Sequence, residues 1–300
     1  MEKRMRLRLS CLIVSCVLLI ALRAYTRWQI DPPVPYCELL GLTLSDEQEK
    51  DLSREFRPKE RAAARHASGF GAVSMRQSAP IAVWLVGPSA AGKSTVVARA
   101  ALGLGVGSSE SGPFGVDAVL IDGDHFRISH AGYQDVVQDG WAHGCVWKQA
   151  YPFLRESLRQ EKTAMLHAAV RKRSNLLIPH TCQSREECWG ALELLRRKGY
   201  INHVVLVLGN KGTIQSRGNR RARKTGKRYA PQEWDLSVTN ALGMLSRANG
   251  FSELVWTTPT NKWLVRRGDA NSVLDALRHR LGSSQLEDAT MIDSGQPVQK

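Results

Sequence analysis

The segment that most constrains the fold of this chain reads Gly87-Pro-Ser-Ala-Ala-Gly92-Lys93-Ser94 and fits the pattern G-x-x-x-x-G-K-[ST]. It directly follows an apolar run, Ile81–Val86, and a stretch with helical periodicity begins at Ser94. The glycines let successive backbone N–H groups turn inward around a phosphate, and the start of the helix adds its partial positive charge. Strand, loop and helix in this order predict a phosphate-binding loop in an α/β domain.

The side chains of this loop predict the ligand. Lys93 is expected to reach the β- and γ-phosphates of a nucleotide, and the Ser94 hydroxyl is expected to be a metal ligand for Mg²⁺. ATP or GTP together with Mg²⁺ are therefore the expected cofactors. The expected nucleotide-binding residues are Gly87, Pro88, Ser89, Ala90, Ala91, Gly92, Lys93, Ser94 and Thr95.

The rest of the chain alternates short β-branched runs with longer helical stretches, and hydrophobic residues, at 43%, are enough for a sizeable core. This alternation predicts a doubly wound, mainly parallel sheet with helices on both faces, which is the three-layer α/β/α P-loop architecture. The expected strands are Ile81–Val86, Ala118–Asp122, Asn175–Ile178, His203–Leu208 and Glu253–Thr257. The expected helices are Ser94–Leu102, Val146–Arg173, Ser184–Lys198, Gly212–Arg223, Pro231–Asn249 and Asn271–Leu281.

Further segments are predicted on either side of this core. A capping-box opening at Ser45–Gln48 begins a charged leading helix, which Pro58 should break or kink. A stretch rich in Gly, Ser and Ala ends at Pro80 and marks the start of the main domain. The expected organisation is 1–28 as a membrane-targeting segment, 29–79 as a linker with the leading helix, 80–282 as the P-loop domain and 283–300 as a disordered tail.

The N-terminal segment contains an apolar run, Leu9–Leu22, between clusters of basic residues. The run is short for a membrane-spanning helix, which needs about 17–25 residues, unless the residues after it extend the span. A single-pass signal anchor is the expectation, with a cleaved signal peptide or an organellar presequence as alternatives. The protein is therefore expected to associate with a membrane through this segment, or to lie in the secretory pathway or an organelle lumen after cleavage.

Six cysteines are scattered through the chain at positions 11, 16, 37, 145, 182 and 188. They form no C-x-x-C pair and no Cys/His spacing typical of zinc sites, and they lack the density of small disulfide-bonded domains. The sequence therefore predicts free thiols without a structural metal.

A second chemical signal is the run Ile121-Asp-Gly-Asp-His-Phe-Arg127, at the end of the second expected strand. Ligands of open parallel sheets bind at the carboxyl ends of the strands, so Asp122 and Asp124 are expected to face the phosphate site. One of them can accept the proton of an attacking hydroxyl while the other orients Mg²⁺ through water. A solvated Asp-Gly turn is the alternative reading of the same residues.

A third signal is the stretch 211–228, which holds eight basic residues and no acidic one in a chain with a net charge of +14. Such a segment can close over a moving phosphoryl group and neutralise its charge, with Gly226 as a hinge. Basic runs also bind nucleic acid or membranes, and this alternative stays open. The basic residues are Lys211, Arg217, Arg220, Arg221, Arg223, Lys224, Lys227 and Arg228.

The succession of these motifs over about residues 80–260, with a strand that ends near Thr181, resembles the zeta toxin family of P-loop kinases. Members of that family phosphorylate a sugar hydroxyl of UDP-N-acetylglucosamine or of related nucleotide sugars. The resemblance implies that Asp124 is the catalytic base and that Lys93 and Ser94 bind the nucleotide. It also implies that Asp122, Arg127 and Thr181 bind substrate, and that Arg217 and Arg228 contact phosphate, with Arg220 or Arg221 as replacements for Arg217.

Two departures from the family pattern affect the acceptor. Pro179-His180 stands where the family usually has Glu-Gly, and Gly103–Gly115 is a Gly- and Ser-rich insertion. The expected function is transfer of a γ-phosphoryl group to a hydroxyl of a small-molecule acceptor. A kinase similar to adenylylsulfate kinases, another small-molecule kinase, and a non-catalytic, membrane-anchored module for nucleotide or RNA are the alternatives.

Overall fold

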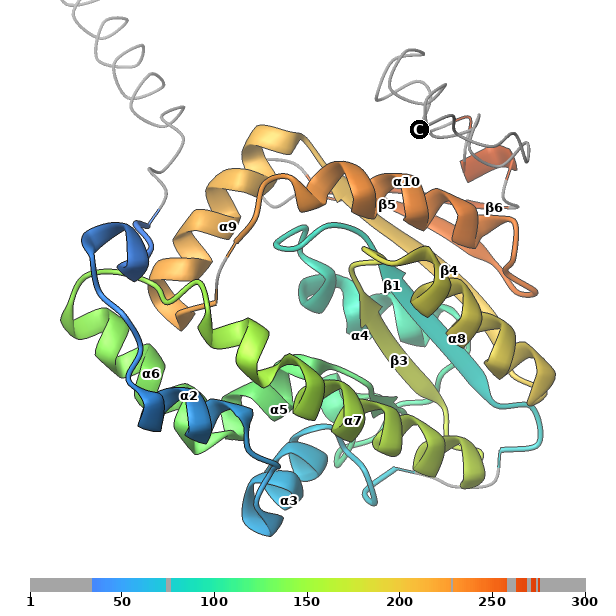
Figure 1. Cartoon of the computed structure of the whole chain (residues 1–300). Helices are drawn as coiled ribbons and strands as arrows, with labels where there is room; N and C mark the ends of the chain where they lie inside the picture. The colour runs from blue at the N-terminus through green and yellow to red at the C-terminus, as the bar shows by residue number, and fades with distance from the viewer. Residues whose placement is uncertain are drawn as a thin grey trace, which may run out of the picture. The chain divides into compact units, whose positions relative to one another are not determined.

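A six-stranded sheet in the order β2-β3-β1-β4-β5-β6 organises the chain (Figure 1). The computed structural model describes residues 34–73, 77–227, 229–257, 263–268, 271–273 and 275. The strands are β1 (Ile81–Val86), β2 (Val119–Leu120), β3 (Leu176–His180), β4 (Ile201–Gly209), β5 (Ser252–Thr257) and β6 (Trp263–Gly268).

Strand β1 lies between β3 and β4, and the pairs from β2 to β5 are all parallel. Five consecutive residues of β1, from Ala82 to Val86, are buried, as expected for a strand with helices on both faces. The chain winds to one side of β1 for β2 and β3 and to the other side for β4 and β5. The loop after β1 therefore lies where the winding direction changes, which is the usual ligand position in such sheets.

The helices flank this sheet. Helix α4 packs on β1 and β3, while α8 and α10 contact each other and β4. The helices are α2 (Asp46–Ser53), α3 (Pro58–Ala67), α4 (Lys93–Gly103), α5 (Gly123–Ser129), α6 (Ala131–Ala142), α7 (Ala150–Arg171), α8 (Arg185–Arg197), α9 (Lys211–Thr225) and α10 (Glu233–Leu245), with the short 3₁₀ turns η1 (Cys37–Leu40) and η2 (Pro113–Gly115). The three-layer α/β P-loop fold predicted from the sequence is confirmed.

Several boundaries differ from the sequence prediction. Strand β2 has only two residues, because Asp122 caps a helix by accepting a hydrogen bond from the Asp124 amide at 2.9 Å. Helices α5 and α6 were not predicted, since α5 is one short piece of seven residues and α6 holds two glycines that obscure its periodicity. The sixth strand, which pairs antiparallel with β5, was also missed.

The leading segment folds onto the core. Ser45 and Gln48 form the predicted capping box, and Pro58 separates α2 from α3 as the first residue of the second helix. Arg54 donates two hydrogen bonds to the buried Glu60 carboxylate at 2.8 and 2.6 Å, and Glu60 also accepts from the Ala131 amide at 2.9 Å. The segment expected as a linker thus anchors α6, and the compact unit of the chain includes residues from Val34 onward.

The prediction of free thiols is wrong for two cysteines. Cys37 and Cys145 form a disulfide that joins positions 108 residues apart. An isolated parallel bridge between Tyr36 and Val146 brings the two segments together, and the Cys37 amide donates to the Val146 carbonyl oxygen at 3.2 Å. The same bridge keeps Val146 extended, so α7 begins at Ala150 rather than at the predicted Val146.

Some predictions fall outside the described residues: the segment 1–28, the tail 283–300, most of the last predicted helix, and Arg228. Among the residues that are described, no helix combines the length and apolar character needed to cross a bilayer.

Candidate active site

The phosphate-binding loop follows β1 and is held by both neighbouring strands. The Gly87 amide donates to the carbonyl oxygen of His180 at the end of β3 at 3.3 Å. A β-carbon on Gly87 would collide with the Val207 carbonyl of β4, so no larger residue fits there. Gly92 has φ 95° and lies directly before α4, a left-handed conformation that L side chains rarely adopt. The loop is therefore fixed by backbone contacts, as the sequence pattern requires.

Lys93 folds back over this loop. Its ammonium group donates to the carbonyl oxygens of Gly87 at 2.7 Å and Pro88 at 2.9 Å. Burial, followed by the positive charges of Arg221 and Lys227, lowers the pKa of Lys93 from 10.5 to about 7. The negative charge of a phosphate would offset this burial and repulsion, so the site is electrostatically suited to a polyanion.

The predicted acidic pair lies at the start of α5. Asp122 is the N-cap, and Asp124 is in the first turn, half-buried. Phe56, which lies between α2 and α3, packs against α5: its ring makes an edge-to-face contact with Phe126, with 5.8 Å between the ring centroids. The two carboxylates are thus placed by a helix start rather than by strand alternation.

Asp124 is surrounded by cations. Its Oδ1 accepts from Lys227 at 2.6 Å and lies 3.0 Å from the buried Arg127 guanidinium. Burial opposes ionisation of this carboxyl, but the charges of Lys227 and Arg127 outweigh burial and hold its pKa well below the ordinary value. The aspartate is ionised at neutral pH, as a proton acceptor must be.

Helix α9 carries two arginines to the phosphate loop, beside the carboxyl ends of the strands (Figure 1). Arg221 donates to the Ser89 hydroxyl of the loop at 2.7 Å, and Arg217 donates to the Thr257 hydroxyl at 3.1 Å. Thr257 Oγ1 lies 3.3 Å from the carbonyl oxygen of Ala91 in the loop. Of the alternatives left open by the sequence, Arg221 is the arginine in direct contact with the loop.

A further group lies at the end of β3. Thr181, the predicted substrate contact, follows His180, whose backbone holds Gly87. Burial, followed by the charges of Lys162 and Lys93, lowers the pKa of His180 to about 3. Lys162 of α7 forms no hydrogen bond or ion pair among the described residues, and burial lowers its pKa.

Sequence reasoning assigned no role to Lys162, and named Lys227 only as part of the basic run. Lys162 lies in the middle of a long amphipathic helix with no local motif. Only packing shows that Asp122, Asp124 and Cys182 lie in its electrostatic environment.

The donors near the loop suit a hard cation. The Ser94 hydroxyl is exposed in the first turn of α4, and Asp122 uses one carboxylate oxygen for capping while the other remains. Hydroxyl and carboxylate oxygens are the ligand types that Mg²⁺ takes, together with phosphate oxygens and water. The residues present therefore fit a nucleotide-bound Mg²⁺.

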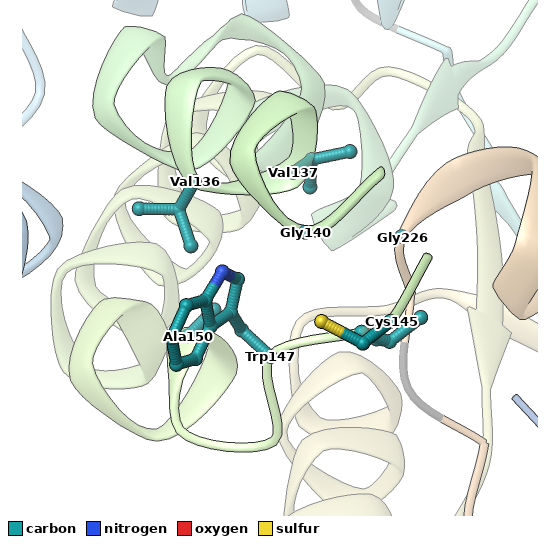
Figure 2. A pocket seen from close by; sticks show the side chains of 8 residues that line it. Val136, Val137, Gly140, Cys145, Trp147, Ala150 and Gly226 are labelled. Carbon is teal, nitrogen blue, oxygen red and sulfur yellow. The ribbon is translucent and has the colours of Figure 1, made fainter. Parts of the chain in front are cut away.

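A separate crevice lies behind the segment that carries Lys227 (Figure 2). It is lined by apolar groups from α6, the 145–150 segment and Gly226, and it is too narrow for a water molecule. A β-carbon on Gly226 would collide with Val137. The crevice is thus a packing contact between the turn after α9 and α6, not a ligand site.

Together, the fold and the site define a P-loop protein of the kinase-like class. The chain belongs to the zeta toxin family, whose model, described as "Zeta toxin", matches residues 69–276, more than half of the chain. A comparison with curated proteins gave no match.

Two solved structures share the fold. A chain from the PezAT chromosomal toxin–antitoxin system of Streptococcus pneumoniae is 17% identical, with a TM-score of 0.50, and the match covers 82% of this chain and 98% of the other. A chain from AvrRxo1-ORF1:-ORF2 solved with ATP is 13% identical, with a TM-score of 0.50, and the match covers 85% of this chain and 74% of the other. At these identities the likeness concerns the fold alone.

Proposed function

We propose that this protein is a Mg²⁺-dependent phosphotransferase that moves the γ-phosphoryl group of ATP or GTP to a hydroxyl of a small-molecule acceptor. The observation that carries the proposal is the convergence of Lys93, Asp124 and Arg221 at one end of the sheet. A fixed cation for the phosphates, an ionised carboxylate and a second cation on a neighbouring helix are the parts that phosphoryl transfer needs. Membership of the zeta toxin family supports the same reaction class.

Each residue has a task in this reaction. The loop amides and Lys93 bind the β- and γ-phosphates, and Asp124 accepts the proton of the acceptor hydroxyl. Lys227 and Arg127 both contact Oδ1 of Asp124, at 2.6 and 3.0 Å, so Oδ2 is the oxygen assigned to accept the proton. Arg221 neutralises the charge that spreads over the moving phosphoryl group, and Arg217 supports it from the loop's other end. Ser94 and, through water, Asp122 would hold Mg²⁺, which when bound would offset the negative charge of the phosphates.

The acceptor side differs from the family pattern. His180 supplies a neutral ring next to Thr181, and Lys162 supplies a cation whose charge acts on His180, where the family's glutamate would supply an anion. A nucleotide sugar such as UDP-N-acetylglucosamine remains a candidate acceptor, because its phosphates suit the added cation. An adenylylsulfate or another phosphorylated metabolite satisfies the same charge requirement.

The basic residues of α9 favour a catalytic role over nucleic-acid binding. Arg221 and Lys227 contact the loop and Asp124, and Lys211 is paired with Asp235 at 2.9 Å. A polyanion-binding face presents its cations to solvent, whereas Arg221 and Lys227 are turned to the site; Lys211, Arg220, Arg223 and Lys224 are exposed. RNA retention by the purified protein that persists in an Arg221→Ala variant would instead support the nucleic-acid reading.

The test of the function is transfer of label. The purified full chain is incubated with γ-labelled ATP or GTP, Mg²⁺ and a panel of nucleotide sugars, nucleosides and adenylylsulfate, and products are separated. We expect one acceptor to gain label, and Asp124→Asn to reduce the rate about 10²–10⁴-fold with nearly unchanged nucleotide binding, since an amide cannot accept the proton. Asp135→Asn, at an exposed position of α6, is the matched control. If Asp124→Asn keeps more than a tenth of the turnover at saturating acceptor, Asp124 is not the base.

For the N-terminal segment we propose a membrane anchor, on the grounds of the apolar run Leu9–Leu22. Deleting residues 1–28 should release the protein from membrane fractions into the supernatant. Carbonate-resistant pelleting of the truncated protein would place the attachment elsewhere.

A further inference from the structure

Three potential metal ligands meet at the end of β3, next to the phosphate loop. A ring nitrogen of His180 and the sulfur atoms of Cys182 and Cys188 all lie within 4.8 Å of one another. Both thiols are fully buried and neither is in a disulfide, whereas His180 is half-buried. The two thiols take no part in the phosphotransfer steps above, and the spacing of the three residues, H-x-C-x₅-C, differs from the common spacings of zinc sites.

The distances suit a tetrahedral metal. With metal–sulfur bonds of about 2.3 Å and metal–nitrogen bonds of about 2.0–2.1 Å, ligand atoms around Zn²⁺ lie roughly 3.5 Å apart. The three donor atoms, all within 4.8 Å of one another, are at most about 1.3 Å farther apart than that spacing. Two thiolates and an imidazole are the donors that select Zn²⁺ over Mg²⁺.

The backbone around the cluster is held in place without a metal. Cys182 has φ 50°, a left-handed conformation that is costly for a residue with a β-carbon and tends to occur at functional sites. Asn240 of α10 donates to the carbonyl oxygen of Cys182 at 2.8 Å and so fixes this turn. The His180 Nδ1 accepts from the Cys182 amide at 2.9 Å and so orients the ring beside Cys182; a metal bound at this nitrogen would replace that hydrogen bond. Both ends of the β3–α8 turn are thus positioned before any ion enters.

We propose that His180, Cys182 and Cys188 bind one Zn²⁺ through three protein ligands, with water in the fourth position. Binding releases the protons of the two thiols and forms two metal–thiolate bonds, with no change of oxidation state. Thr181 lies between two of the ligands, so the ion fixes the loop that carries this residue. The proposal does not depend on the phosphotransferase activity, because the ion is a structural clamp.

The test uses the purified full chain, treated with chelator and kept reduced by a phosphine. Titration with Co²⁺ should saturate at one equivalent and give thiolate-to-cobalt charge-transfer absorption, which Zn²⁺ then displaces. Cys188→Ser and His180→Gln should weaken Co²⁺ binding by more than the about 10–100-fold seen when supporting contacts of metal ligands are removed. His167→Gln, an exposed histidine of α7, is the matched control and should bind normally.

Thermal unfolding gives an independent readout. Zn²⁺ should raise the melting temperature of the wild-type chain, because an ion that binds only the folded state stabilises it, and should leave the two ligand variants unchanged. Absence of the charge-transfer band, or equal Co²⁺ binding by wild type and Cys188→Ser, overturns the proposal. A disulfide between Cys182 and Cys188 in protein isolated under alkylating conditions overturns it too, since a disulfide provides no thiolate ligands. If Cys188→Ser fails to fold, Co²⁺ binding by His180→Gln and the charge-transfer band of the wild type still test whether the three residues bind a metal.

Discussion

The nucleotide half of the site and its transfer half are built in different ways. The nucleotide half is the single segment 87–95, held by the ends of β3 and β4 through backbone contacts. The transfer half combines side chains from α5, α7, α9 and the turn after α9: Asp124, Arg127, Lys162, Arg221 and Lys227. A binding site made of backbone is encoded locally, whereas a charge cluster made of side chains depends on the packing of the whole domain.

The largest loss of transfer rate should come from replacing Lys93, the side chain that is proposed to bind the phosphates in the nucleotide half. Lys93→Ala should reduce transfer by about 10³–10⁵-fold, the range for a cation on the moving phosphoryl group, and should also weaken nucleotide binding. Turnover at saturating acceptor and nucleotide affinity by calorimetry measure both effects. Lys198→Ala, an exposed lysine on the far end of α8, is the control. Unchanged turnover would remove the proposed function altogether.

The next largest effect should separate the transfer rate from nucleotide affinity, and so distinguish the transfer half from the nucleotide half. Arg221→Ala should lower the transfer rate about 10²–10³-fold with little change in nucleotide affinity, because its cation acts mainly when charge develops. Lys224→Ala on the same helix is exposed and should have no effect. Equal losses in rate and affinity would make Arg221 part of the nucleotide half. Arg228 lies outside the described residues, and the same split between rate and affinity stays a prediction for Arg228→Ala.

A smaller effect should appear with pH. Lys93 has a pKa of about 7 in the empty site, and a bound phosphate should raise this pKa, so nucleotide binding should be accompanied by proton uptake. Apparent nucleotide affinity should therefore fall by up to about tenfold per pH unit above pH 7. Over the same range the empty protein should become more stable, since the unfolded chain binds the proton that folded Lys93 does not. Calorimetry in buffers of different ionisation enthalpy measures the proton uptake, and affinity that is constant between pH 7 and 9 would contradict this assignment.

The smallest effect on catalysis should come from loss of the Cys37–Cys145 disulfide, which none of the proposed reaction steps uses. Cys37 is next to Tyr36, whose hydroxyl donates to the Tyr229 carbonyl oxygen at 3.3 Å, close in sequence to Lys227. Cys37→Ser should lower the free energy of unfolding by about 2–4 kcal/mol, as loss of a long-range disulfide does, and change turnover by less than tenfold. Denaturant unfolding with and without reductant tests the first part. A variant as stable as wild type in both conditions would mean that the disulfide does not form in solution.

Sequence reasoning predicted the loop 87–95 between a strand and a helix, and the structure has this loop between β1 and α4, because glycine conformation and loop spacing leave a local pattern. The roles of these residues in nucleotide binding and of Asp124 as the base stay predictions. Sequence reasoning could not choose among Arg217, Arg220 and Arg221, since the packing of α9 decides which side chain faces Ser89. It missed the Cys37–Cys145 disulfide as well, because no local spacing connects positions 108 residues apart.

The sequence by itself determined the fold class, the phosphate loop, and the presence of an acidic pair and a cationic segment. Those features depend on propensity, periodicity and the conformational freedom of glycine, all of which act over a few residues. Only the tertiary structure decided which cations surround Asp124, that the charge of Lys162 acts on His180, and that His180, Cys182 and Cys188 lie within 4.8 Å of one another. These side-chain contacts depend on how helices from distant parts of the chain pack around the sheet. Side-chain packing is a property of the assembled core and leaves no local sequence pattern.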